Sequence, residues 1–135
     1  MLLAGLLLLA AAPPSPPCAI SVEAAADGSF AQAGYDARPA RLEPLAALTR
    51  DRFAAAARRL CTGGVLRPTD LARFRKLIVQ NGEGATEPLI YRTPEMAPGI
   101  YVFQYAFQDG DPPDAAAFEQ ALRCWKRPKS CDFGD

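Results

Sequence analysis

The sequence predicts one small α+β domain in which about three helices pack on one face of an antiparallel sheet. Disulfide bonds are expected to stabilise this fold. Three observations predict this class. The chain has 135 residues of which 50% are hydrophobic, enough for one domain with a single core. Its hydrophobic spacing changes from helical to extended along the chain. Its four cysteines are an even set, which is typical of disulfide-bonded exported proteins.

The N-terminus indicates export. Residues 1–12, MLLAGLLLLAAA, are uninterruptedly apolar, but a helix needs about 20 such residues to span a bilayer. Their length suits a secretory signal, and the proline-rich residues 13–17 end the segment. We therefore expect a signal peptide over residues 1–12, a linker over 13–17 and one periplasmic or extracellular domain over 18–135. An uncleaved anchor and a cytoplasmic chain are the alternatives.

In an oxidising compartment the cysteines are expected to pair. Cys124 and Cys131 are close in sequence, so one chain reversal joins them, and Cys18 is left to pair with Cys61. In the chain-entropy picture the small loop contributes about 2.5 kcal/mol and the large one about 4 kcal/mol. A zinc site with four thiolates is the alternative, but no two cysteines have the C-x2-C spacing of such sites. We expect no metal and no cofactor.

The first half of the domain is expected to begin with a hairpin and continue with two helices. Residues 19–24 alternate as a strand does, and the turn at 27–29 leads toward a second strand over 29–35. A helix is expected from Leu42 to the glycine pair at 63–64, with Pro44 in its first turn. A second helix is expected from Thr69 to about residue 80, because its apolar residues recur at helical spacing. These residues are Leu71, Phe74, Leu77 and Ile78.

The second half is expected to form a hairpin and a last helix. Residues 89–92 and 100–107 are extended in character and are separated by a loop rich in proline and glycine, which predicts an antiparallel pair. The acidic turn at 109–114 suits the start of a helix, where the helix dipole favours negative charge. One face of that helix is apolar and is expected to dock on the sheet. It is formed by Phe118, Ala121, Leu122 and Trp125.

One face of the strand at 100–107 is entirely aromatic. Because side chains alternate along a strand, four rings share that face. Large rings usually pack against helices in a core, and lining a binding groove is the alternative use. The candidate aromatic binding face is Tyr101, Phe103, Tyr105 and Phe107.

Charge is balanced overall but divided along the chain. The net charge is zero, so no nucleic-acid partner is expected. Residues 38–76 are mainly basic and residues 77–122 are mainly acidic. Such a division of charge suits binding to an anionic envelope surface or to an envelope protein. Two alternatives are that the arginines form a solvated helix face, or that the basic and acidic halves of the domain attract each other. The candidate anion-binding residues are Arg50, Arg52, Arg58, Arg59, Arg73 and Arg75.

The composition removes most enzymatic chemistry. The chain has no histidine, which excludes histidine general bases, Ser-His-Asp and Cys-His catalysis. It also has no phosphate-binding glycine loop. A pair of carboxylates can still hydrolyse a glycosidic bond, and Glu83, Glu87 and Glu95 are the candidates for such a pair. We expect a secreted or periplasmic non-catalytic binding or accessory protein, with a carboxylate-dependent hydrolase acting on a cell-envelope substrate as the alternative.

Three short motifs resemble a known family. The tripeptide Ile-Ser-Val at 20–22, Asp-Gly-Ser at 27–29 and the pair Leu42 and Leu45 occur in the order seen in the periplasmic domains of the ExbD and TolR energy-transducing proteins. The resemblance implies a small α+β periplasmic module, which is a further alternative for this chain. The membrane helix of that family contains an acidic residue, whereas residues 1–12 are uncharged. No functional residue is carried over.

Overall fold

The computed structural model describes residues 17–107 and 111–131 of the protein. The apolar segment 1–12 and residues 13–16 of the linker lie outside the described residues, so the signal peptide stays a prediction. In the part that the structure describes, no helix is long and apolar enough to cross a membrane.

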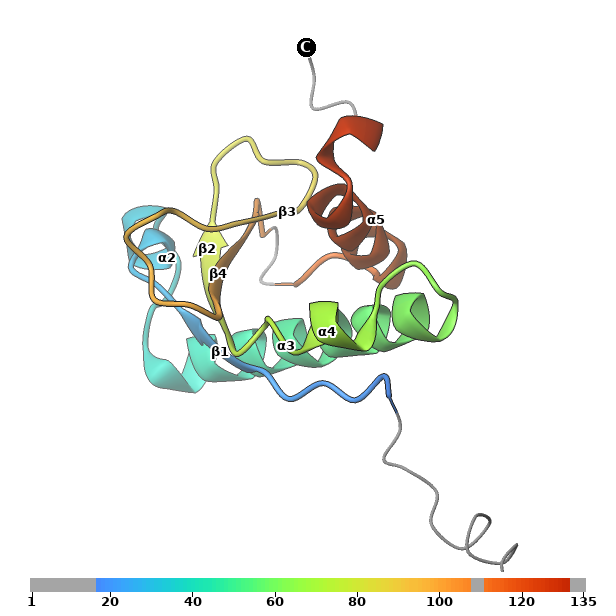
Figure 1. Ribbon diagram of the computed structural model, residues 1–135. Helices are drawn as coiled ribbons and strands as arrows, with labels where there is room; N and C mark the ends of the chain where they lie inside the picture. Colours follow the sequence, from blue (N-terminus) through green and yellow to red (C-terminus); the bar gives the residue numbers. More distant parts are fainter. Residues whose placement is uncertain (1–16, 108–110, 132–135) are drawn as a thin grey trace, which may run out of the picture.

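The described residues form a small α+β domain, as the sequence predicts. In Figure 1 the long helix α3 runs below the strands and α5 stands beside them. The elements, in chain order, are β1 (Glu23–Ala26), α2 (Ser29–Gln32), α3 (Pro39–Thr62), α4 (Pro68–Leu71), β2 (Lys76–Asn81), β3 (Leu89–Tyr91), β4 (Ile100–Tyr105), α5 (Ala115–Lys126) and the 3-10 turn η1 (Pro128–Ser130).

The sheet is mixed, and the prediction of an antiparallel sheet was wrong in this respect. Its strand order is β1-β2-β4-β3, and β1 and β4 both run parallel to β2. The chain returns from β1 to β2 through α3, and a crossover of this length lets the next strand start at the same end. The pair β3–β4 is antiparallel, which confirms the predicted hairpin in the second half.

The predicted first hairpin does not form. The chain enters the short helix α2 after β1, where the Asp27 carboxylate accepts a hydrogen bond from the Ser29 backbone N–H at 2.9 Å. The Ser29 hydroxyl in turn accepts one from the backbone N–H of Asn81 at the end of β2, at 2.7 Å. The turn therefore leads into α2 and not into a second strand, and the strand next to β1 is β2.

The predicted second helix is one turn long. It ends at Leu71, and β2 begins at Lys76. The spacing of the apolar residues fits a helix, but Leu77 and Val79 are both fully buried with a less buried residue between them, which is the period of a strand. Parallel partners on both sides cover this segment, and the β-branched Ile78 and Val79 suit such a position.

The core lies between one face of the sheet and the helices α3 and α5. Leu77 and Val79 of β2 and Phe103 of β4 are completely buried there, together with Phe53 of α3. The ring of Phe103 stacks on that of Phe118 from α5, with centroids 4.8 Å apart and planes 10° from parallel. The docking of the last helix by its apolar face is thereby confirmed.

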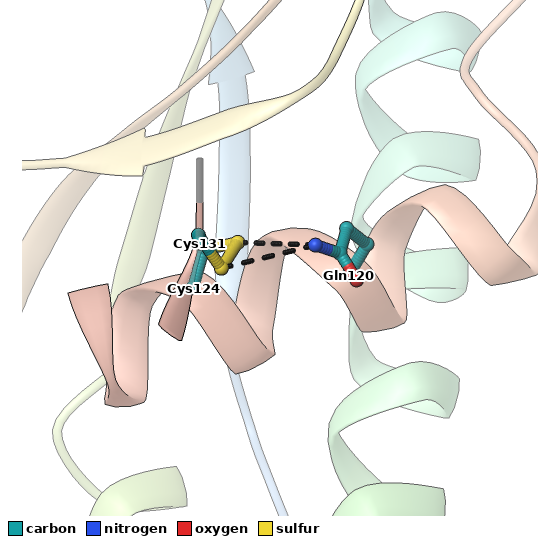
Figure 2. The surroundings of a disulfide bond; sticks show 3 residues. All are labelled: Gln120, Cys124 and Cys131. Atoms are coloured by element: carbon teal, nitrogen blue, oxygen red, sulfur yellow. Dashed lines mark hydrogen bonds between the residues drawn. A yellow bond between two sulfur atoms is a disulfide. The ribbon is translucent and has the colours of Figure 1, made fainter. Parts of the chain in front are cut away.

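Two disulfide bonds close the domain at its ends, in the predicted pairs. Cys18 is joined to Cys61, which ties the segment before β1 to the last turn of α3. Cys124 is joined to Cys131, which folds the chain after α5 back onto that helix. Figure 2 shows the amide of Gln120 beside this second bond, with its Nε2 3.3 Å from Cys124 Sγ and 3.8 Å from Cys131 Sγ.

Replacing Phe118 tests the contact between α5 and the sheet. Phe118→Ala removes a fully buried ring and is expected to lower the free energy of unfolding by about 3–5 kcal/mol. Phe118→Leu keeps most of the volume and is expected to cost about 1–2 kcal/mol. Urea unfolding followed by circular dichroism measures both. If both variants lost the same free energy of unfolding, the contribution of Phe118 would not come from the packing of its ring against the sheet.

Candidate functional site

The six arginines singled out in the sequence do not form one surface. Arg59 is paired with Glu119 of α5 at 2.8 Å, and Arg50 with its neighbour Asp51 at 2.9 Å. The Arg52 guanidinium donates hydrogen bonds to the backbone carbonyls of Pro112 and Pro113, at 3.2 and 3.0 Å. Arg52 and Arg59 therefore attach α3 to α5 and to the segment that precedes it.

Arg73 and Arg75 lie apart from the other four, in a pocket of about 440 Å³. We call it the arginine pocket. Its walls come from the segment between α4 and β2, from the residue after β3 and from the start of β4. These segments meet because β2 and β4 pair in parallel from their first residues, Lys76 opposite Ile100. The lining residues are Ala72, Arg73, Arg75, Arg92, Pro98, Gly99 and Tyr101.

The buried ring of Phe74 lies between Arg73 and Arg75 in the sequence and fixes the position of both. The Phe74 ring is 1% exposed and lies between the aromatic residues of three elements. Its centroid is 5.0 Å from that of Phe53 and 4.6 Å from those of Tyr101 and Trp125. Because this ring points into the core, the residues on either side of it, Arg73 and Arg75, are exposed at the surface.

Each of these two arginines rests on a neutral surface. The Arg73 guanidinium lies 5.1 Å from the centre of the Trp125 ring, within the range of a cation–π contact. The stem of Arg75 lies over Gly99, where a Cβ would come within 2.7 Å of the arginine Cδ. Gly99 also has a φ of +87°, a backbone conformation that favours glycine. A side chain at this position is therefore disfavoured both by the contact with Arg75 and by the backbone conformation.

The third arginine, Arg92, is fixed by backbone carbonyls. Its guanidinium donates hydrogen bonds to the carbonyl oxygens of Met96, Ala97 and Ile100 at 3.0–3.3 Å. It also lies 5.6 Å from the centre of the Tyr101 ring. These contacts hold the loop between β3 and β4, and the Arg92 guanidinium has no carboxylate partner among the described residues.

The arginine pocket carries three positive charges, and the one described carboxylate shown to act electrostatically on any of them is that of Asp70, near Arg73. No ion pair within residues 17–107 and 111–131 involves Arg73, Arg75 or Arg92. An acid on α4, Asp70, is bound elsewhere, because both of its carboxylate oxygens accept hydrogen bonds from Lys126 Nζ, at 3.0 and 2.8 Å. Three arginines therefore line one pocket.

The Asp70 carboxylate is ionised in spite of its burial. Burial by itself raises its pKa. The hydrogen bonds from Lys126 and from the Arg67 backbone N–H, together with the charges of Lys126 and Arg73, outweigh burial and hold the pKa below its ordinary value of 3.8. The ion pair thus joins α4 to α5 just beside the arginine pocket.

The aromatic face is largely part of the core. Tyr101, Phe103 and Phe107 are at most 3% exposed, and Tyr105 is half-buried. Of the four rings, Tyr101 borders the arginine pocket.

The carboxylates considered for hydrolysis lie outside the arginine pocket. Glu83, Glu87 and Glu95 are all exposed. Across the residues described, no group of three or more cysteine, aspartate or glutamate side chains is arranged to hold a metal ion.

Sequence reasoning named Arg73 and Arg75 but missed Arg92. Arg92 stands alone in an acidic stretch, and only the pairing of β3 with β4 brings it to the other two. No protein-family model matches the chain, and neither a curated protein nor a solved structure matches it. The likeness to the ExbD and TolR domains therefore remains a resemblance, and the site is defined by its geometry alone.

The Asp70–Lys126 pair predicts a specific dependence of stability on pH. Because the folded-state pKa of Asp70 is lowered, its contribution is fully present above its unfolded pKa, near 3.8, and is lost as the pH falls through the lower folded value. Asp70→Asn is expected to cost about 1–3 kcal/mol at pH 7. The cost should shrink toward pH 2, as measured by urea unfolding. If Asp70→Asn lowered the free energy of unfolding equally at pH 7 and pH 2, the stabilising role of the ionised Asp70 carboxylate would be contradicted.

Arg52 and Arg59 are expected to act on stability. The double variant Arg52→Glu with Arg59→Glu loses two carbonyl contacts and an exposed ion pair, so we expect a loss of about 1–3 kcal/mol, mostly from Arg52. The matched control is Arg58→Glu, an exposed position on the same helix, for which the loss should stay within about 0.5 kcal/mol. Similar midpoints of thermal unfolding for the two proteins would refute this role.

Proposed function

We propose that this chain is an exported, non-catalytic binding or accessory protein whose arginine pocket receives an anionic group of an envelope surface. The observation that supports this most strongly is the set Arg73, Arg75 and Arg92. These three arginines line one pocket, and none of them forms an ion pair with a carboxylate of the described residues. An anion with two or more oxygen atoms is the ligand that such a set attracts.

Export is supported by three compatible features. The apolar residues 1–12 have the length of a secretory signal. Both disulfides join cysteines of one chain, and such bonds persist in oxidising compartments. The described residues contain no membrane-crossing helix.

The three arginines have different parts in binding. A guanidinium presents its N–H groups as a planar fork that matches the oxygens of a carboxylate or phosphate. Arg73 and Arg75 have N–H groups available for this, since their contacts are with an indole ring and a glycine. Arg92 has its N–H groups directed at carbonyls and contributes mainly its charge. The volume of the pocket falls within the range of small-molecule sites.

Vesicle binding tests the proposal. The protein should sediment with vesicles of phosphatidylglycerol and phosphatidylcholine at low ionic strength and not with phosphatidylcholine alone. Binding should fall steeply as salt is raised, because the Debye length shrinks to about 8 Å at physiological ionic strength. Arg73→Glu with Arg75→Glu should weaken it at least about tenfold, since two charges of the pocket are reversed.

The control changes the net charge equally at another place. Arg38 and Arg41 are exposed and both lie beside Asp36 at the start of α3. Arg38→Glu with Arg41→Glu should keep the affinity within about twofold if the pocket is the site. Equal losses in both double variants would mean that binding follows net charge, and the proposed function would then be wrong.

A further inference from the structure

A second surface lies at the free edge of the sheet. Strand β1 is one of the two edge strands of the described sheet, β3 being the other, and β2 lies on its paired side (Figure 1). The backbone N–H groups of Glu23 and Asp27 donate to carbonyls of Arg75 and Val79, both at 3.0 Å. Because alternate residues of a parallel strand face the same neighbour, the N–H and C=O groups of Ala24 and Ala26 point to the opposite side. No described strand lies there.

A long hollow follows this edge. One part, of about 550 Å³, lies between β1 and the face of α3 that holds Leu42, Ala46 and Ala47. Another, of about 350 Å³, continues beside residues 20–22 and reaches Arg58. Arg50 lines both parts, so they meet at this residue. We call the two together the edge trough.

We infer that the edge trough binds an extended peptide segment of a partner protein, which adds to β1 as a fifth strand. Unpaired main-chain donors and acceptors at a sheet edge are satisfied by another main chain in extended form, and the side-chain pockets beside the edge then select the sequence. The small side chains of Ala24 and Ala26 leave room for this strand next to α3.

The lining residues define the chemistry of the peptide. Alternate side chains of the added strand face α3, so they should be apolar to match Leu42, Ala46 and Ala47. Charge marks the two ends. Glu43 lies at the end near Ala26 and Arg58 at the end near residues 20–22, and neither has an ion-pair partner in the described part of the chain. A basic residue at the first end and an acidic one at the second complete the match.

A second copy of this chain fits the edge less well than a peptide does. Helix α3 packs more extensively on β1 than on β2, so it lies near the edge. Pairing β1 with β1 of another copy would place the strands about 4.8 Å apart, whereas packed helices need about 8–10 Å between their axes. In an antiparallel pair of β1 strands both α3 helices would lie on the same face of the joined sheet and would collide. A peptide strand that carries no helix on that face avoids this collision.

Hydrogen exchange gives a direct readout of the added strand. The probes are the peptide Lys-Thr-Val-Thr-Val-Thr-Glu and its reversed sequence. In both, the valine and charged side chains share the face toward α3, and the charges fall at the matching ends for an antiparallel and a parallel strand, respectively. At saturation with one of them, exchange of the Ala24 and Ala26 amides should slow at least about tenfold, because they gain hydrogen bonds. The same peptide methylated on alternate backbone nitrogens should not bind.

Two variants separate binding at the trough from a general effect. Ala24→Pro removes an amide that points away from β2, and Ala47→Arg fills the trough, so each should weaken peptide binding about tenfold. Ala55→Arg, also on α3 but outside the trough, is the matched control and should change it less than about twofold.

Three results would overturn the inference. They are the absence of saturable binding of either peptide, equal binding of the methylated peptide, and protection of Ala24 and Ala26 that rises with protein concentration alone. The last result would make a second copy of the chain the occupant.

Discussion

The packing of Phe74 is the contact on which the rest of this structure depends. Its ring touches Phe53 of α3, Tyr101 of β4 and Trp125 of α5, so one side chain joins both long helices to the sheet. Aromatic pairs at these distances stabilise beyond the area that they bury. Since Phe74 directly precedes β2, its position also sets where the central strand begins.

The arginine pocket follows from the same contact. The residues on either side of Phe74 are arginines, and a ring fixed in the core leaves their side chains at the surface. Trp125 and Tyr101, which contact Phe74, also lie under Arg73 and Arg92. The ion pair between Asp70 and Lys126 joins α4 and α5 nearby, and both oxygens of the Asp70 carboxylate accept hydrogen bonds from Lys126 rather than from Arg73. A packed aromatic cluster thus carries on its surface arginines that form no ion pair with the part of the chain that the structure describes.

Local signals predicted the parts of the fold that depend on near neighbours. The end of α3 at its glycine pair, the β3–β4 hairpin, the apolar face of α5 and the Cys124–Cys131 pair are short-range features, and all are confirmed. The Cys18–Cys61 pair spans 43 residues and was predicted only because these two cysteines were left once the near pair was joined. A helix was wrongly predicted for residues 72–80 because Leu71, Phe74 and Leu77 have helical spacing. The segment forms the strand β2 because it pairs in parallel with β1 on one side and β4 on the other. Arg92 was missed for the same reason, since only strand pairing brings it to Arg73.

Nuclear magnetic resonance of the arginine side chains tests the central claim most directly. In a titration of the intact protein with inorganic phosphate at low ionic strength, the Nε–Hε signals report which guanidinium groups meet the anion. The account predicts saturable shifts of Arg73 and Arg75, with the signals of Arg38, Arg41 and Arg58 unchanged. Small, equal and non-saturating shifts of all exposed arginines would contradict it, because they would show that Phe74 and its neighbours present no site.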